Sequence, residues 1–428
     1  MKQRRFKFFP QQIYDGLFLV LLIFVSNRRA LVCWYVLVPE YYCEYGTAFT
    51  DYVSWGMLVL VAFLMAVQHK RLHEFWLGWR NNWLLALFIL YSIISISWSI
   101  VPDRSIHTAY IMVTASIIGN LLAILYSPQQ LIKILLWFTL LCGLFSLALV
   151  LALPGVGIHQ ERWLAEAWHG VFTHKNYLGS ILALGNCLSL ISFALASGRR
   201  GQVMNTLYYL FTLFMILMTR SATGLILWAV LNGLSVLFFV WTKWYAELQK
   251  MNRKWLLGLL ASVFTLVAAS ISAIFLVMGR DLTLTGRVPL WQILLTHVVP
   301  QKPWFGYGLE TLWYFLAFQI WNGRATGWGI TVVNGHSGYM DMLIYLGVVG
   351  LVILLIFLAQ GFVRAVRRAL TSRTWLDFFP LLVFVYLLVV NITISYFLEF
   401  ESFHWVLLTT LLFLPLGRLE ESTSAQQV

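Results

Sequence analysis

Long apolar runs separated by short polar segments organise this sequence from one end to the other. A helix that crosses the hydrocarbon core of a bilayer needs roughly 20 mostly apolar residues, and runs of that kind recur along the chain. The pattern predicts an all-α polytopic membrane protein with about twelve transmembrane helices. The predicted spans are approximately residues 14–38, 53–68, 82–101, 106–126, 132–153, 175–197, 203–219, 222–241, 255–277, 339–360, 376–396 and 404–417.

Composition excludes a soluble protein of this length. The chain is 60% hydrophobic and only 11% charged, whereas soluble domains carry about 25% charged residues. The net charge of +12 does not indicate nucleic-acid binding, because the basic residues form short clusters between apolar runs. The 4 cysteines show no paired spacing, so neither a disulfide framework nor a thiolate metal site is predicted.

The basic clusters predict the orientation of the helices. With the N-terminus in the cytoplasm, most of the 29 Lys and Arg residues fall on the cytoplasmic side, as the positive-inside rule requires. Both termini are then cytoplasmic, and the first apolar run is a retained helix, because no small-residue cleavage site follows it. We expect one transmembrane domain over residues 1–428, with a short outer loop at 154–175, a large outer loop at 278–338 and a cytoplasmic tail at 418–428.

The large outer loop lies between the ninth and tenth predicted helices and contains two amphipathic stretches. The first is a helix that follows Thr285–Gly286, has Pro289 in its first turn and ends at Pro300. The second, Leu309–Trp321, is rich in aromatic residues, which is typical of an interfacial helix.

Arginines on the outer side are the first candidates for chemistry. Arg220 lies between two spans, and Arg280, Arg287 and Arg324 lie in the large loop. A guanidinium offers a bidentate fork to phosphate, and outward placement runs against the positive-inside bias. These positions therefore favour an anionic ligand, although Arg220 as an interfacial snorkelling residue and the others as solvated loop residues are open alternatives.

Histidines are the second candidates. His336 follows Asn334–Gly335 and, with Ser337, opens the tenth predicted helix; a helix N-terminus favours the neutral imidazole, which can accept a proton. Downstream, Gly347 and Gly350 would let another helix approach closely. A purely structural role for His336 is the alternative. The short outer loop adds a histidine set without the spacing or carboxylates of a metal site, so substrate contact or loop structure is expected of its members, which are His159, His169 and His174.

Four motifs together resemble the superfamily of O-antigen ligases and O-antigen polymerases. His336-Ser337 precedes Gly347-Val348-Val349-Gly350 by nine residues, as in the family pattern. The other matching segments are Thr285-Gly286-Arg287 through Trp291 with Pro303–Gly308 after it, Arg220 at the outer end of the seventh predicted helix, and Gly170–Gly179. The last segment is most similar to the branch that polymerises exopolysaccharides. At Arg220 the chain reads Thr219-Arg220-Ser221-Ala222, where the family usually has Ser-Arg-Gly.

The resemblance implies a metal-independent glycosyltransferase without a cofactor, in the bacterial inner membrane with its active site facing the periplasm. The donor would be an oligosaccharide on undecaprenyl diphosphate, and the acceptor a hydroxyl of another lipid-linked glycan (polymerase) or of lipid A-core (ligase). His336 would be the general base, with Arg220 and Arg287 on the diphosphate. Substrate contacts would come from Arg280, Arg324, His174, Lys175, Asn176 and Ser337.

Two functions of other classes are open alternatives. A transporter of an anion or a lipid-linked sugar is favoured by Arg28 and Arg29, which interrupt the first span. Transporters, however, place polar groups near the bilayer midplane on broken helices in related repeats, and here the candidates gather at one face. A structural scaffold for polysaccharide assembly would not need the set of arginines and histidines.

Overall fold

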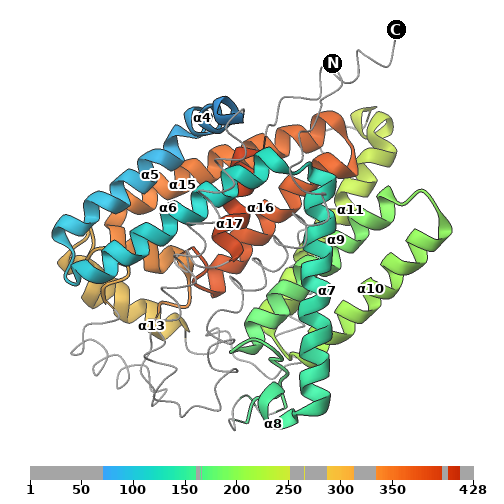
Figure 1. The fold of residues 1–428 in the computed structure, drawn as a ribbon, viewed down its shortest axis with the longest axis horizontal. Coiled ribbons are helices and arrows are strands. Elements are labelled where there is room, and N and C mark those ends of the chain that lie inside the picture. Colours follow the sequence, from blue (N-terminus) through green and yellow to red (C-terminus); the bar gives the residue numbers. More distant parts are fainter. Residues whose placement is uncertain are drawn as a thin grey trace.

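The computed structural model describes residues 71–160, 164, 166–250, 265, 287–312, 334–397 and 403–414. Within these ranges the chain is helical (Figure 1), apart from loops and one isolated antiparallel bridge between Ile158 and Trp168. The predicted spans 14–38, 53–68 and 255–277 lie outside the described residues, as do Arg28, Arg29, Arg280 and Arg324.

Seven of the described helices are long and apolar enough to cross a membrane. An eighth is possible if α4 (Leu72–Asn81) and α5 (Trp83–Ile94, continued by a 3-10 turn to Trp98), bent by 81° at Asn82, form one span. A shorter apolar helix, α17, covers Phe403–Phe413. The seven are α6 (Pro102–Leu125), α7 (Pro128–Ala152), α9 (Lys175–Leu195), α10 (Arg199–Met218), α11 (Ala222–Lys250), α15 (Gly338–Ser372) and α16 (Trp375–Thr393). The protein is thus a multi-pass membrane protein, and the total of about twelve spans stays a prediction.

Helix starts follow local sequence signals. Ser127 and Gln130 form a capping box at the start of α7, where Pro128 takes the first helical position. The Thr374 hydroxyl accepts a hydrogen bond from the Asp377 N–H at the start of α16. These signals place the polar ends of the helices and so set the register of the apolar faces between them.

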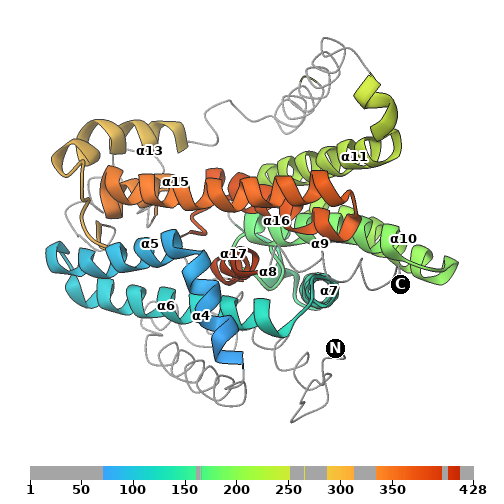
Figure 2. The same cartoon turned by 90° about the horizontal axis from the view of Figure 1, so that it is seen from above.

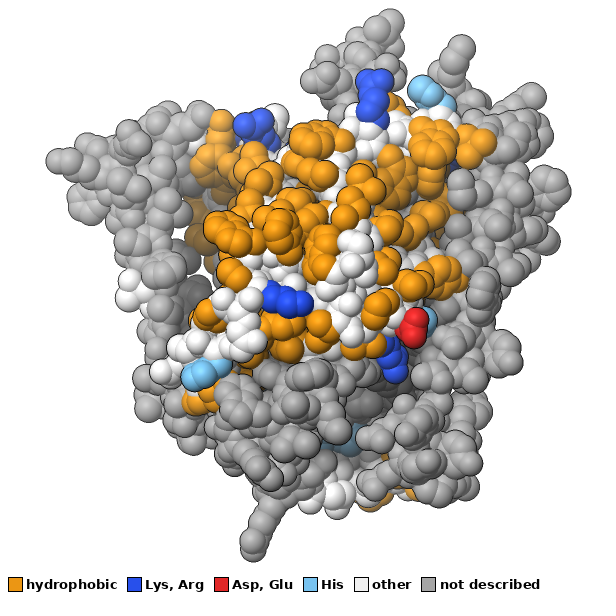
Figure 3. All heavy atoms as spheres, turned by 90° about the vertical axis from the view of Figure 1, so that its left-hand side faces the viewer, with side chains coloured by type: hydrophobic (Ala, Val, Ile, Leu, Met, Phe, Trp, Pro, Cys, Tyr) orange, Lys and Arg blue, Asp and Glu red, His pale blue; other side chains and the backbone are white. Residues whose placement is uncertain are grey.

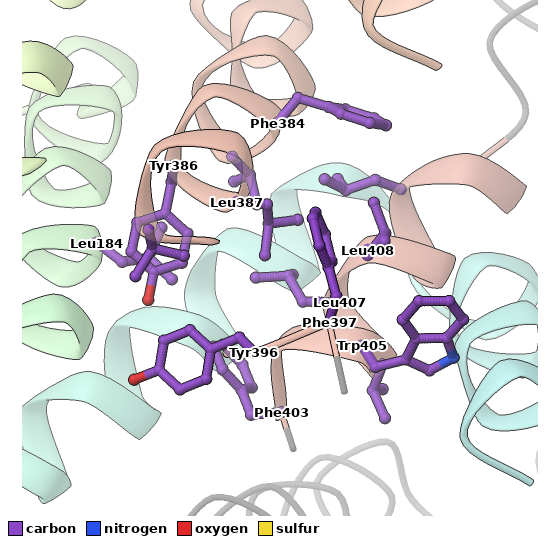
Figure 4. Close-up of a cluster of buried hydrophobic side chains, with 14 of the residues drawn as sticks. Leu184, Phe384, Tyr386, Leu387, Tyr396, Phe397, Phe403, Trp405, Leu407 and Leu408 are labelled. Carbon is purple, nitrogen blue, oxygen red and sulfur yellow. The ribbon is translucent and has the colours of Figure 1, made fainter. Parts of the chain in front are cut away.

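Helix α9 is the centre of one half of the bundle, in contact with α7, α10, α11 and α16. A Cβ on Gly224 of α11 would lie 3.0 Å from the Gly179 Cα of α9, so glycine allows this close approach. In the other half, α15 packs against α5 and α16, and α17 lies between α16 and α6 (Figure 2). Large apolar side chains of α9, α16 and α17 meet where the halves join (Figure 4).

Apolar side chains also cover outward surfaces. On α10, Val203, Leu207, Leu210, Phe214 and Leu217 recur at helical spacing and are 47–56% exposed. Hydrophobic side chains dominate the described part of the face shown in Figure 3. In a soluble protein such areas would be a liability, whereas lipid covers them in a membrane.

The bundle has a site end, defined here as the end at which α9, α11 and α15 begin. Several arginines of the described helices lie at the opposite end. Arg364 donates to Asn82 at 2.7 Å and Arg368 pairs with buried Asp377 at 2.5 Å. Arg199 and Arg200 open α10 at this same end.

Helix α15 is broken at Gly347, and a loop completes it. Gly347 has φ 65° and ψ −169°, a conformation that is essentially restricted to glycine. Residues 303–308 enter the break. The Val348 and Val349 N–H groups donate to the carbonyls of Pro303 and Trp304 at 2.8 and 3.2 Å.

On the other side of the break, Tyr307 and Gly308 donate their N–H groups to the carbonyls of Ile344 and Tyr345, both at 3.0 Å. The Tyr91 hydroxyl donates to the Leu346 carbonyl. The expectation that Gly347 admits a neighbouring helix was therefore wrong: the backbone that approaches it is this loop.

Candidate functional site

Three segments that are far apart in the sequence meet at the site end. His174 is the N-cap of α9, Arg287 is the first residue of α13 (Arg287–Ile293), and His336 lies two residues before α15. The charges of His336 and Arg287 both lower the pKa of His174, and the charge of Arg287 lowers that of His336. The three side chains are thus within electrostatic range of one another.

His336 is held in a left-handed backbone conformation, with φ 50°. Its N–H donates to the Asn334 Oδ1 at 3.0 Å. Burial, and then the positive charge of Arg287, lower the pKa of His336 to about 4. The imidazole is therefore neutral near pH 7, the form that the sequence predicted, and burial and Arg287 are the causes.

His174 is fixed in one tautomer by its capping role. Its Nδ1 accepts a hydrogen bond from the Asn176 N–H at 3.2 Å, so the proton of the neutral ring is on Nε2. Burial, and then the charges of His159, Lys175, His336 and Arg287, lower the pKa of His174 to about 3. His174 therefore offers a neutral Nε2–H donor.

The histidine rings of the loop before α9 contact one another in tilted and edge-to-face arrangements. The His159 ring centroid is 4.5 Å from that of His169 and 5.3 Å from that of His174. The backbone occupies one nitrogen of each ring: His159 Nε2 accepts from the Lys175 N–H, and His169 Nδ1 contacts the Phe172 carbonyl. No group of three or more His, Cys, Asp or Glu side chains among the described residues is arranged to hold a metal ion.

Lys175 and Asn176 join this loop to the turn between α10 and α11. The buried Lys175 ammonium donates to the Arg220 carbonyl at 3.3 Å. The Ser221 hydroxyl donates to Asn176 Oδ1 at 2.7 Å and accepts from the Gly224 N–H at 3.1 Å, which caps α11. Because α9 and α11 are so closely packed here, the loop and the turn form one structure.

Arg220 lies in this turn at the site end, where the sequence placed it, with φ 47°. Its guanidinium pairs with the Glu166 carboxylate at 2.7 Å, and the two side chains are 56% and 74% exposed. An exposed ion pair of this kind contributes little to stability. The pairing with Glu166 therefore restrains Arg220 only weakly.

The structure brings most of the predicted site residues into one neighbourhood. Arg220, Arg287, His174, Lys175, Asn176, His336 and Ser337 all lie at the site end. Buried Ser337 donates its hydroxyl proton to the Asn391 carbonyl at 3.2 Å, so only its oxygen lone pairs are left for a substrate. Arg280 and Arg324 lie outside the described residues, and their roles stay predictions, as do those of the others.

Sequence reasoning did not identify three other residues of this neighbourhood as functional. The Trp291 indole N–H donates to the Gly335 carbonyl at 2.7 Å, and buried Asp341 accepts from the Gly335 N–H at 2.8 Å. Glu166 pairs with Arg220. Only Trp291 had a signal in the sequence, since it closes the motif that Arg287 opens.

Comparison with known proteins finds one family model and one relative that match this chain. Residues 207–355 match the O-antigen ligase family model. The chain is also 27% identical over 310 residues to the exopolysaccharide production protein ExoQ of Rhizobium meliloti (strain 1021), with 68% of this chain and 66% of ExoQ covered. The match thus spans just under two thirds of that relative. These findings confirm the resemblance to the O-antigen ligase and polymerase superfamily, on its exopolysaccharide branch.

Proposed function

We propose that this relative of the O-antigen ligases is a membrane glycosyltransferase that polymerises an exopolysaccharide. It would transfer an oligosaccharide from a polyprenyl diphosphate to the hydroxyl of another lipid-linked glycan, at the periplasmic face of the inner membrane. The observation that carries the proposal is the convergence of neutral His336 with Arg287 and His174 at one end of the bundle.

The arginines suit the departing diphosphate. As the bond between the anomeric carbon and the phosphate oxygen breaks, negative charge grows on the diphosphate, and fixed cations at that position lower the barrier. Arg287 is a cation beside both histidines. Arg220 can exchange Glu166 for a phosphate, and the His174 Nε2–H adds a neutral donor.

His336 suits the acceptor. A neutral imidazole can take the hydroxyl proton as the acceptor oxygen attacks the anomeric carbon from the side opposite the diphosphate. One glycosidic bond forms, the bond to the phosphate breaks, and the proton passes through His336 to water. The protein's own residues supply every group that this scheme needs.

The proposed orientation of the site toward the periplasm is supported by the arginines at the opposite end of the bundle. Arg364 and Arg368 near the end of α15 lie opposite the site, as do Arg199 and Arg200 at the start of α10. By the positive-inside rule that end is cytoplasmic, and the site then faces the periplasm.

A transporter is less well supported, although α15 is a broken helix. Transporters use the freed backbone groups of such breaks to bind their cargo. Here the groups beside Gly347 are paired with residues 303–308. The break is therefore filled by the protein's own backbone.

The test is to incubate purified protein with an undecaprenyl-diphosphate-linked oligosaccharide and to measure product length by mass spectrometry. We expect longer lipid-linked chains, and elongation that is roughly 10²- to 10⁴-fold slower with His336→Ala. Transfer only to added lipid A-core would identify a ligase. Uptake of the unaltered donor into proteoliposomes without any new product would identify a transporter.

A further inference from the structure

The backbone before His336 is fixed by side chains from three positions. The Gly335 carbonyl and the His336 N–H belong to the same peptide unit: the carbonyl accepts from the Trp291 indole at 2.7 Å, and the N–H donates to Asn334 Oδ1 at 3.0 Å. The peptide unit before it is held through the Gly335 N–H, which donates to Asp341 at 2.8 Å.

These hydrogen bonds act on a strained residue. His336 has φ 50°, a conformation that is uncommon for residues other than glycine and that persists only where the surroundings enforce it. Of the groups that hold it, Asn334 and Asp341 lie within a few residues of His336. Among the described hydrogen bonds to these two peptide units, the one from Trp291 comes from a distant part of the chain, and Trp291 lies one turn after Arg287 in α13.

We infer that Trp291 is a positioning residue for His336, which fixes the imidazole relative to the arginine on the same helix. The inference rests on the proposed role of His336 as the general base. Through one hydrogen bond, the helix that carries the proposed diphosphate ligand also sets the backbone of the proposed base. A base that is misplaced by about 1 Å loses much of its effect, so the contact bears on turnover rather than on donor binding.

The test compares Trp291→Phe with a matched control, Trp241→Phe. Trp241 lies in the second half of α11, and its indole N–H has no hydrogen-bond partner among the described residues. Loss of one hydrogen bond to a buried carbonyl predicts a fall in kcat of roughly tenfold for Trp291→Phe. The KM for the lipid-linked donor should stay unchanged, and Trp241→Phe should match the wild type in both constants.

A double variant shows whether Trp291 acts through His336. If it does, Trp291→Phe in a His336→Ala background should cause no further loss, because the group that it positions is gone. A further tenfold loss in that background would refute the inference, as would a Trp291→Phe protein with the kcat of the wild type. If Trp291→Phe does not fold, Asn334→Ala removes the acceptor at the other end of the same peptide unit, with the same expectations.

Failure of the proposed function gives a different result. If His336→Ala keeps its transfer activity, His336 is not the base and the proposed mechanism is wrong. If His336→Ala is inactive while Trp291→Phe and Asn334→Ala are both fully active, only the positioning role of Trp291 is overturned.

Discussion

Replacement of Gly347 by alanine should disturb the site end without touching any proposed substrate contact. A Cβ at this position would lie 2.5 Å from the Phe305 nitrogen and closer still to the Trp304 carbonyl. The backbone conformation adds strain of about 1–3 kcal/mol for a residue other than glycine. To relieve both, the loop at 303–308 would have to leave the break.

The cost of that departure follows from the hydrogen bonds across the break. Four backbone hydrogen bonds would be lost, each contributing about 0.5–1.5 kcal/mol. The destabilisation is therefore roughly 2–6 kcal/mol, which is large for one substitution.

The assay is thermal unfolding in detergent, together with the transfer reaction. We expect the unfolding temperature of Gly347→Ala to fall by roughly 5–10 °C and transfer to be largely lost. Gly198→Ala is the matched control, because no atom lies within 4 Å of its added Cβ and its φ of −155° is open to any residue. A Gly347→Ala protein as stable and active as Gly198→Ala would refute this account of the break.

Three further predictions concern the site and its facing. Burial and Arg287 lower the pKa of His336 to about 4, so kcat/KM should be flat from about pH 6 to 8 and fall only as the pH approaches 4 and the base becomes protonated. Bound diphosphate should raise the pKa of His336, so kcat should fall at a higher pH than kcat/KM does. A rise of kcat/KM through pH 6.5 would contradict the lowered pKa. Arg287→Lys and Arg220→Lys should each slow turnover roughly ten- to a hundredfold, because the bidentate fork is lost; full activity in both would remove the arginines from the diphosphate site. In intact cells Gln160→Cys should react with a membrane-impermeant thiol reagent and Ser197→Cys should not, both side chains being exposed at opposite ends of the bundle; the reverse result would place the site in the cytoplasm.

Hydropathy predicted the described membrane helices well because each of them carries apolar side chains along its own length, whether these face lipid or other helices. It failed at helix ends that extend beyond the apolar run. The predicted span 339–360 is part of α15, which continues to Ser372, since Arg364 and Arg368 find polar partners in Asn82 and Asp377.

The outer segments were predicted with mixed success. A helix does start at Arg287 after Thr285–Gly286, and the helical segment runs to Gln301, next to Pro300. Of the expected helix Leu309–Trp321, only residues 309–312 are described: the first two form a turn and Leu312 is in a 3-10 conformation.

The candidate site was predicted in its residue types but not in its contacts. Arg287 and His336 stood out because charge and histidine are unusual on the outer side of a membrane protein. The hydrogen bond from Trp291 to Gly335 and the tautomer of His174 depend on how distant segments pack, and a single sequence carries no signal for such pairings.

The broken helix has a consequence for how the protein is made. Backbone groups left unpaired in lipid cost several kcal/mol each, so the two halves of α15 cannot separate at Gly347 until residues 303–308 arrive to pair with them. Glycine is tolerated in a continuous helix at a cost of only about 0.5–1 kcal/mol, so α15 can enter the bilayer straight and bend later. The loop precedes α15 in synthesis and reaches the break from the site end. Docking of the loop would then be a late step of assembly, and a newly inserted chain would stay inactive until it is complete.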